Sequence, residues 1–119
     1  MATKKFVLDF YKSDALTNRE VMDTFLHPDV VVEWNSTKGF LEMKRDEILD
    51  LSSELGRAYE SSRVNISHLL QDGNHVSVRY SIYVKTIENP REEMLLAHFM
   101  VIWEVKDGKL FRGYQMSQL

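Results

Sequence analysis

Hydrophobic residues in the first part of the chain recur with a helical period. One face of an expected first helix has apolar residues at i, i+1, i+4 and i+5, namely Phe6, Val7, Phe10 and Tyr11. The segment T-N-R-E at residues 17–20 has the form of a capping box that begins at Thr17 and has Glu20 as the reciprocal partner. It predicts a second, short helix that ends before His27, because Pro28 disfavours helix at the residue preceding it.

Strand patterns follow Pro28 and are interrupted by one further helical segment. The β-branched run at residues 29–35 predicts a strand, and residues 40–42 predict a brief second strand after the turn S-T-K-G. From Lys44 the helical period returns, with one side formed by Ile48, Leu51, Ser52, Leu55 and Tyr59. The rest of the chain predicts four strands in an antiparallel meander, at residues 64–70, 75–86, 94–105 and 109–118. Segregated helices and antiparallel strands predict an α+β domain with helices packed on one sheet face.

The segment at residues 94–105, M-L-L-A-H-F-M-V-I-W-E-V, is apolar on both of its alternating faces. Phe99, Val101, Trp103 and Val105 point one way, whereas Met100 and Ile102 point the other way. A strand in an antiparallel sheet normally buries one face and exposes the other to water. This strand therefore requires two covers, and a second subunit is the simplest cover for the outer face.

Composition limits the class of protein. At 119 residues with 44% hydrophobic content, we expect one domain spanning residues 1–119 with a substantial core. A net charge of −3 without a basic stripe weighs against nucleic acid as a partner. The absence of cysteine excludes disulfides and thiolate chemistry. We find no apolar run long enough for a membrane span or an export signal, and therefore expect a cytoplasmic protein with no membrane partner.

Three segments of the sequence, and the order of the expected helices and strands, resemble those of one superfamily. They are F-L-H-P-D-V-V-V-E-W, K-R-D-E-I and W-E-V-K-D-G-K-L-F-R-G-Y. Over essentially the whole chain, the sequence resembles the NTF2-like superfamily, which includes SnoaL-like proteins and ketosteroid isomerases. The resemblance implies a cone-shaped, strongly curved antiparallel sheet wrapped around three N-terminal helices and enclosing an apolar pocket. It also implies a homodimer through the outer sheet face, with His98, Met100 and Ile102 toward the partner.

The resemblance also allows a test for isomerase chemistry, because it implies where catalytic groups would lie. The general base falls on Trp34, the oxyanion-hole tyrosine on Phe10 and the protonated acid on Val101; two supporting tyrosines fall on Leu26 and Ser52. None of these positions has the family's group. A shift of one residue would restore a tyrosine at Tyr11 and a carboxylate at Glu33, but it would turn the first strand inside out. Enolisation requires a base and a hydrogen-bond donor, so isomerase chemistry is disfavoured.

The pocket that remains is expected to be aromatic with a few polar points. Its expected lining is Phe10, Trp34, Leu51, Ser52, Leu55, Val78, Tyr80, Phe99, Val101, Trp103 and Gln115, with Ser117 as a further polar group. Such a wall suits a flat apolar molecule, although each aromatic residue could instead simply fill the core. Trp34 and Tyr80 are the preferred ligand contacts, since their N–H and O–H groups must find partners when buried.

The histidines give no metal-binding pattern. His27 and His75 lie beside turn residues and are expected to be exposed, and His98 is expected in the interface or the sheet. No two histidines have ligand spacing with a nearby carboxylate, so we expect no metal and no cofactor. His68 and Tyr80 are the only candidates for a titratable catalytic group in the pocket. Gly113, in the last strand, is expected to mark a bulge or bend.

Three functional interpretations follow from these features. The first is a dimeric protein that binds an apolar or aromatic small molecule without chemistry. The second is a SnoaL-like cyclase, isomerase or hydrolase that acts on a polyketide- or steroid-like substrate. The third is an interaction domain whose outer sheet face binds another protein. The residues at Phe10, Trp34 and Val101 favour the first over the second.

Overall fold

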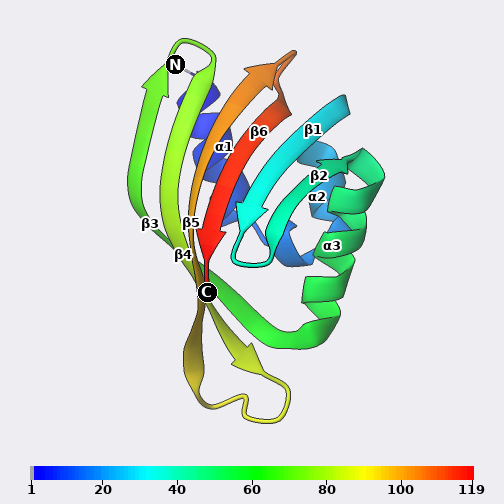
Figure 1. Cartoon of the computed structure of the whole chain (residues 1–119), viewed down its shortest axis with the longest axis vertical. Coiled ribbons are helices and arrows are strands. Elements are labelled where there is room, and N and C mark those ends of the chain that lie inside the picture. The colour runs from blue at the N-terminus through cyan, green and yellow to red at the C-terminus, as the bar shows by residue number, and fades with distance from the viewer. Residues whose placement is uncertain (1) are drawn as a thin grey trace.

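A six-stranded sheet and three α-helices form the structure, a computed structural model that describes residues 2–119 (Figure 1). The elements, in chain order, are α1 (Ala2–Lys12), the 3-10 turn η1 (Ala15–Thr17), α2 (Arg19–Phe25), β1 (Leu26–Ser36), β2 (Gly39–Lys44), α3 (Arg45–Ala58), β3 (Tyr59–Asp72), β4 (His75–Thr86), β5 (Glu93–Lys106) and β6 (Lys109–Gln118). This is the α+β class that the sequence predicted. None of the helices in this part of the chain is long and apolar enough to cross a membrane.

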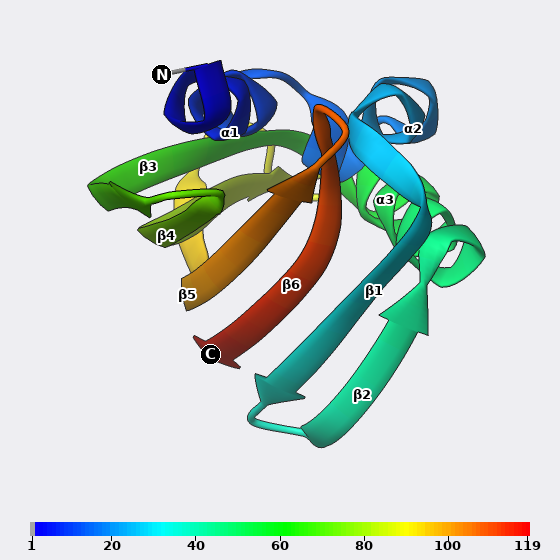
Figure 2. The ribbon, with the colours of Figure 1, turned by 90° about the horizontal axis from the view of Figure 1, so that it is seen from above.

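The sheet is curved and unclosed, and its strand order is β2-β1-β6-β5-β4-β3. The strands from β3 to β6 form the predicted antiparallel meander. One pairing differs from the expected all-antiparallel sheet, because β1 runs parallel to β6. This pairing places Trp34 opposite Gln115, and so brings an early strand beside the last one. Figure 2 shows the sheet curving beneath the helices, with α1 over β3 and β4 and with α3 beside β1 and β2.

The helices contact the sheet through the apolar faces that their period predicted. In α1, Val7, Phe10 and Tyr11 are buried, and Phe6 is partly buried and packs against the same core. In α3, Ile48, Leu49 and Ser52 are buried. The Ser52 hydroxyl donates to the carbonyl of Ala15 at 2.6 Å, which ties α3 to η1.

The N-terminal cap of α2 differs from the prediction. Asn18, not Thr17, is the cap: its side-chain oxygen accepts from the backbone N–H groups of Glu20 and Val21 at 3.1 and 3.3 Å. Thr17 lies instead in η1, and its hydroxyl donates to the carbonyl of Asp14. The 3-10 turn accounts for the displacement, because it leaves Asn18 as the first extended residue before the helix.

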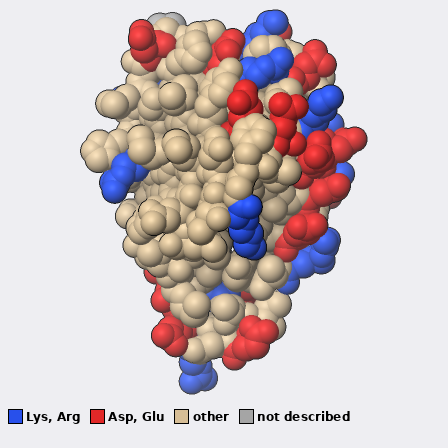
Figure 3. All heavy atoms as spheres, in the orientation of Figure 1, with Lys and Arg blue, Asp and Glu red and all other residues tan. Residues whose placement is uncertain are grey.

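Strand β5 alternates as its pattern predicted. Val101 and Trp103 are 2% and 5% exposed on the helix side, whereas Met100 and Ile102 are 56% and 45% exposed on the outer side. On β6, Met116 pairs with Met100 and Tyr114 with Ile102, and both are exposed as well. Figure 3 shows a broad area with few charged groups on the outer face of the sheet, and most of the charged side chains lie toward its border. Arg79 of β4 is exposed and pairs with Met100. The exposed patch of Met100, Ile102, Tyr114 and Met116 is called the outer patch below.

The close approach of α3 to η1 makes a testable prediction at Gly56. A Cβ atom there would lie 2.3 Å from the carbonyl oxygen of Thr17. We expect Gly56→Ala to lower the free energy of unfolding by about 1–3 kcal/mol, because overpacking outweighs the gain in helix propensity. Thermal denaturation followed by circular dichroism measures the effect. Glu54→Ala, on the exposed side of the same helix, is the control and should change stability by less than about 0.5 kcal/mol. A Gly56→Ala protein as stable as wild type would contradict this packing.

Candidate functional site

Two adjoining chambers lie between the curved sheet and the helices. The inner chamber has a volume of about 70 Å³, and the outer chamber has a volume of about 240 Å³. Leu51 and Leu55 of α3 line both chambers. Taken together, the chambers fall near the lower end of the size range of small-molecule sites, which begins at ~300 Å³.

The inner chamber is mostly apolar. Three of its aromatic side chains, Tyr11, Tyr80 and Trp103, carry a polar atom that makes a hydrogen bond. Its lining residues are Phe10, Tyr11, Leu16, Met22, Val32, Met43, Ile48, Leu51, Ser52, Leu55, Tyr80, Trp103 and Gln115. The Trp103 indole N–H donates to the Tyr11 hydroxyl at 2.8 Å, and the Tyr80 hydroxyl donates to the Gln115 side-chain oxygen at 3.1 Å. An indole N–H can only donate, so the Tyr11 oxygen accepts from Trp103 and its own proton remains available.

Both phenols of the inner chamber are held in the neutral form. Burial raises the pKa of the Tyr11 hydroxyl well above its usual range. Burial is also the main cause of the raised pKa of Tyr80, and the neighbouring Tyr11 raises it further. Neutral phenols donate hydrogen bonds and do not act as bases near neutral pH. The Tyr11 hydroxyl therefore keeps its proton, and its polar neighbours are the Trp103 indole and the Tyr80 hydroxyl.

Trp103 is held in place by a residue without a side chain. A Cβ atom at Gly113 would lie 2.7 Å from the six-membered ring of Trp103. Gly113 was expected to mark a bulge or a bend. It pairs in register with both Trp103 and Val32, so no bulge occurs there. The nearest irregularity in the β5–β6 pairing lies between Glu104 and Val105. Gly113 is explained by close contact with the indole.

The outer chamber has an aromatic wall that continues toward the inner chamber. Its lining residues are Trp34, Ser36, Thr37, Lys38, Leu51, Leu55, Tyr59, Ile82, Leu96, Ala97, Phe99, Ser117 and Leu119. The rings of Trp34 and Phe99 lie 6.4 Å apart, and Phe99 stacks on Tyr80 at 5.0 Å with an interplanar angle of 6°. The Trp34 indole N–H donates to the Ser117 hydroxyl at 2.8 Å.

Most of the predicted pocket residues line one of these chambers. They are Phe10, Trp34, Leu51, Ser52, Leu55, Tyr80, Phe99, Trp103 and Gln115. Val78 and Val101 line neither chamber and are instead wholly buried in the core, where they pair with each other across β4 and β5.

His68 is a correction to the sequence analysis, because its side chain is exposed and lies outside both chambers. The β3–β4 pairing shifts between Ile66 and His68, so Leu69 takes the inward place that follows Ile66. The His68 ring lies 3.0 Å from the Ser67 hydroxyl. His68 is therefore not a pocket base in this structure.

The other histidines lie on the surface or at its edge. His98 is exposed on the outer sheet face, with its ring 2.8 Å from the Ser81 hydroxyl. His75 is exposed as expected, but His27 is only partly exposed, because its ring packs edge-on against Phe111 at 4.8 Å. Within residues 2–119, no three His, Asp or Glu side chains gather as a metal site would require.

The predicted pocket lining left out Tyr11, although Tyr11 lines the inner chamber and its hydroxyl accepts from Trp103. The resemblance placed Phe10 at this position, and the structure brings both Phe10 and Tyr11 to the chamber. A signal was present, since Tyr11 belongs to the apolar helical face that also includes Phe10. Shifting the alignment by one residue would place Tyr11 at the tyrosine position and Glu33 at the base position. Glu33 is exposed, however, so it is not a base inside the chambers.

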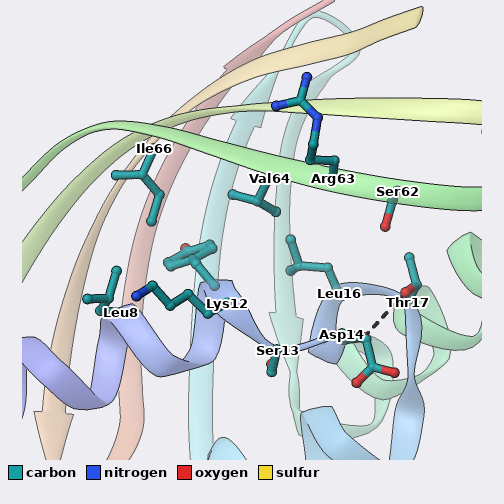
Figure 4. A pocket seen from close by; sticks show the side chains of 11 residues that line it. Leu8, Lys12, Ser13, Asp14, Leu16, Thr17, Ser62, Arg63, Val64 and Ile66 are labelled. Atoms are coloured by element: carbon teal, nitrogen blue, oxygen red, sulfur yellow. Dashed lines mark hydrogen bonds between the residues drawn. The ribbon is translucent and has the colours of Figure 1, made fainter. Parts of the chain in front are cut away.

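An open groove of about 720 Å³ lies on the other side of Tyr11, between the end of α1, η1 and β3. Figure 4 shows Leu16 and Val64 pointing into this groove from opposite sides. Tyr11 and Leu16 line both the groove and the inner chamber. These two side chains therefore separate the inner chamber from the outside at this end.

Solved structures of low sequence identity share the fold. IdmH from Streptomyces antibioticus, a candidate polyketide cyclase, is 14% identical with a TM-score of 0.77, covering 98% of this chain and 92% of its own. A candidate SnoaL-like polyketide cyclase from Jannaschia sp. CCS1 is 11% identical with a TM-score of 0.72, covering 97% of this chain and 84% of its own. TerC, co-crystallised with polyporic acid, is 19% identical with a TM-score of 0.69, covering 97% of this chain and 90% of its own. At these identities the likeness shows the fold alone.

Family membership rests on the sequence as well. Among curated proteins, none matches this chain significantly. The SnoaL-like domain family matches residues 7–113, which is most of the chain from α1 to β6. The chain therefore belongs to the SnoaL-like domain family.

Proposed function

We propose that the protein binds a small, flat, apolar molecule in the two chambers. The observation that carries this proposal is the outer chamber of about 240 Å³, with Trp34 and Phe99 on its wall and Leu51 and Leu55 on α3. Apolar walls with a few fixed polar groups are typical of small-molecule sites. An apolar cavity of ~150 Å³ is large enough for benzene, so this chamber has room for a larger ring system.

The polar groups of the chambers support binding without proton abstraction. No Asp, Glu or His is among the residues that line either chamber. A general base must lie within hydrogen-bond reach of the proton that it removes. At the positions where ketosteroid isomerases would have acids and bases, this chain has Trp34, Phe10 and Val101.

A second candidate function is supported by Tyr11. Its neutral hydroxyl accepts from Trp103 and keeps a proton to donate to a carbonyl oxygen. Polarisation of a carbonyl by a fixed donor in an apolar site is a catalytic device that needs no base on the protein. A cyclisation that depends only on such polarisation is therefore the enzyme reaction this site supports best. Two of the fold neighbours are candidate polyketide cyclases.

We also propose that a second copy of the chain covers the outer patch. Met100, Ile102, Tyr114 and Met116 lie on adjacent strands as two cross-strand pairs, and His98 lies next along β5. Large exposed apolar patches mark interaction sites, and one patch that packs against its own copy makes a two-fold dimer. The four residues of the outer patch are themselves uncharged, which agrees with this assignment, since charge at the centre of an interface is disfavoured.

Removing the Trp34 ring should weaken ligand binding. We expect Trp34→Ala to raise the Kd of naphthalene-2-carboxamide, a neutral two-ring probe, by about tenfold, because stacking and buried area are lost. Isothermal titration calorimetry measures the Kd. Phe40→Ala is the matched control, since Phe40 is an aromatic residue of the same hairpin that is 60% exposed and lines neither chamber. Equal affinities of wild type and Trp34→Ala would place the ligand elsewhere.

The Tyr11 hydroxyl should recognise a carbonyl group. We expect wild type to bind 2-acetylnaphthalene about fivefold more tightly than 2-ethylnaphthalene, and Tyr11→Phe to lose that preference, because one hydrogen bond contributes about 1 kcal/mol. Infrared spectroscopy should show the carbonyl band of the bound ketone at lower frequency in wild type than in Tyr11→Phe. Tyr83→Phe, outside both chambers, is the control. An unchanged band in Tyr11→Phe would exclude Tyr11 as the donor.

A charge in the outer patch should separate the two subunits. We expect wild type to sediment as a dimer in analytical ultracentrifugation and Met100→Lys to sediment as a monomer, because an unpaired ammonium group in an apolar interface is costly. Ile87→Lys adds the same charge at an apolar residue that is 57% exposed outside the patch, and should leave the dimer intact. Wild type that sediments as a monomer at micromolar concentration would refute the assignment.

A further inference from the structure

The entrance to the outer chamber has a distinct electrostatic character. Lys38, in the turn between β1 and β2, is the only charged side chain among the residues that line either chamber. Thr37 in the same turn and Ser117 on β6 lie beside it in the lining. The whole chain has a net charge of −3, so the charged side chain at this lining is opposite in sign to the protein's overall balance.

The polar groups at this entrance are left with protons to donate. The Ser117 hydroxyl accepts from the Trp34 indole at 2.8 Å, and the Thr37 hydroxyl accepts from the backbone N–H of Leu119 at 3.2 Å. Each hydroxyl therefore keeps its own proton for another acceptor. The Lys38 ammonium group has three donor hydrogens and makes no side-chain hydrogen bond or ion pair within residues 2–119.

The Ser36 hydroxyl, at the start of the same turn, already has two hydrogen-bond partners. Ser36 accepts from the backbone N–H of Lys38 at 3.1 Å and donates to the carbonyl of Gly39 at 3.4 Å. These bonds hold the turn in shape and fix where Thr37 and Lys38 leave the backbone. Donors from β6 and from the β1–β2 turn thus lie at one end of the aromatic wall formed by Trp34 and Phe99.

We propose that the ligand of the outer chamber is an anionic planar aromatic molecule. Its rings lie against Trp34 and Phe99, and its carboxylate or enolate oxygen lies at the entrance near Lys38, Thr37 and Ser117. A neutral aromatic molecule would pack against the aromatic wall but leave these donors bound to water. An aromatic molecule with an anionic oxygen would pack against the wall and also accept hydrogen bonds from the donors. This inference rests on the proposed binding function and adds the charge of the ligand to it.

The test compares two probes of nearly the same shape, naphthalene-2-carboxylate and naphthalene-2-carboxamide, by isothermal titration calorimetry. Wild type should bind the carboxylate about two- to fivefold more tightly than the amide, which is the range of an exposed ion pair. The advantage should shrink at high salt, because screening shortens the reach of exposed charges to ~3 Å at 1 M.

Variants of Lys38 separate charge from shape. Lys38→Glu should weaken carboxylate binding about tenfold and leave amide binding within twofold, and Lys38→Gln should remove only the carboxylate's advantage. Lys4→Glu is the matched control: it changes the net charge by the same amount at an exposed residue of α1 that lines neither chamber. Both probes should bind Lys4→Glu as they bind wild type. Circular dichroism shows whether each variant is folded.

The outcomes distinguish this inference from the proposed function. Equal binding of both probes to wild type, or equal weakening of both by Lys38→Glu, overturns the anionic ligand and leaves the aromatic pocket standing. A carboxylate advantage that Lys4→Glu removes as well overturns the role of Lys38. Binding of neither probe to wild type overturns the proposed function and this inference together.

Discussion

The packing of Trp103 joins the last hairpin to the first helix, and the inner chamber is built on it. Its indole lies on Gly113 of β6, where no side chain fits, and it meets Phe10 edge-on at 6.1 Å. Its N–H donates to Tyr11 at 2.8 Å, across 92 positions of sequence. One side chain thus sets the distance between α1 and the sheet. That distance decides whether the interior is filled or hollow.

Curvature and aromatic packing then divide the interior. Near Trp103 the helices and sheet lie close together, and the inner chamber is only about 70 Å³. Toward the open ends of β1 and β6 the space widens to about 240 Å³, with Phe99 stacked on Tyr80 between the two regions. The polar groups follow the same division. A phenol held neutral by burial lines the inner chamber, whereas the charged residue Lys38 lines the outer one.

Features that depend on local period were predictable from the sequence. The alternation of β5 assigned Val101 and Trp103 inward and Met100 and Ile102 outward, and the burial agrees at each residue. The face of α1 that includes Phe10 and Tyr11 was equally clear. Local pattern determines which side of an element is apolar, because side chains repeat every two or 3.6 residues.

Features that depend on one-residue shifts or long-range contacts were not predictable. The irregular pairing after Ile66 turned His68 outward, and the 3-10 turn moved the helix cap from Thr17 to Asn18. The sequence did not predict that Lys38 lines the chamber. Its place there depends on the pairing of β1 with β6, two strands so distant in sequence that the bond from Trp34 to Ser117 spans 83 positions. A bulge or a distant strand pairing changes a side chain's surroundings without changing the local pattern.

The chemistry of this fold is set by a few inward positions, which explains why the shared fold does not transfer an activity. An inward carboxylate in place of Trp34 would supply a base or an acid within the outer chamber. This chain has an indole there, and no carboxylate or imidazole side chain is among the residues that line either chamber. A site with donors and aromatic rings stabilises electron-rich oxygen on a flat frame, and it does so equally for a bound ligand and for a carbonyl that becomes more negative during a reaction. Whether such a site would hold or transform a ligand therefore depends on the ligand's own reactivity, since the same hydrogen bonds would be supplied in either case.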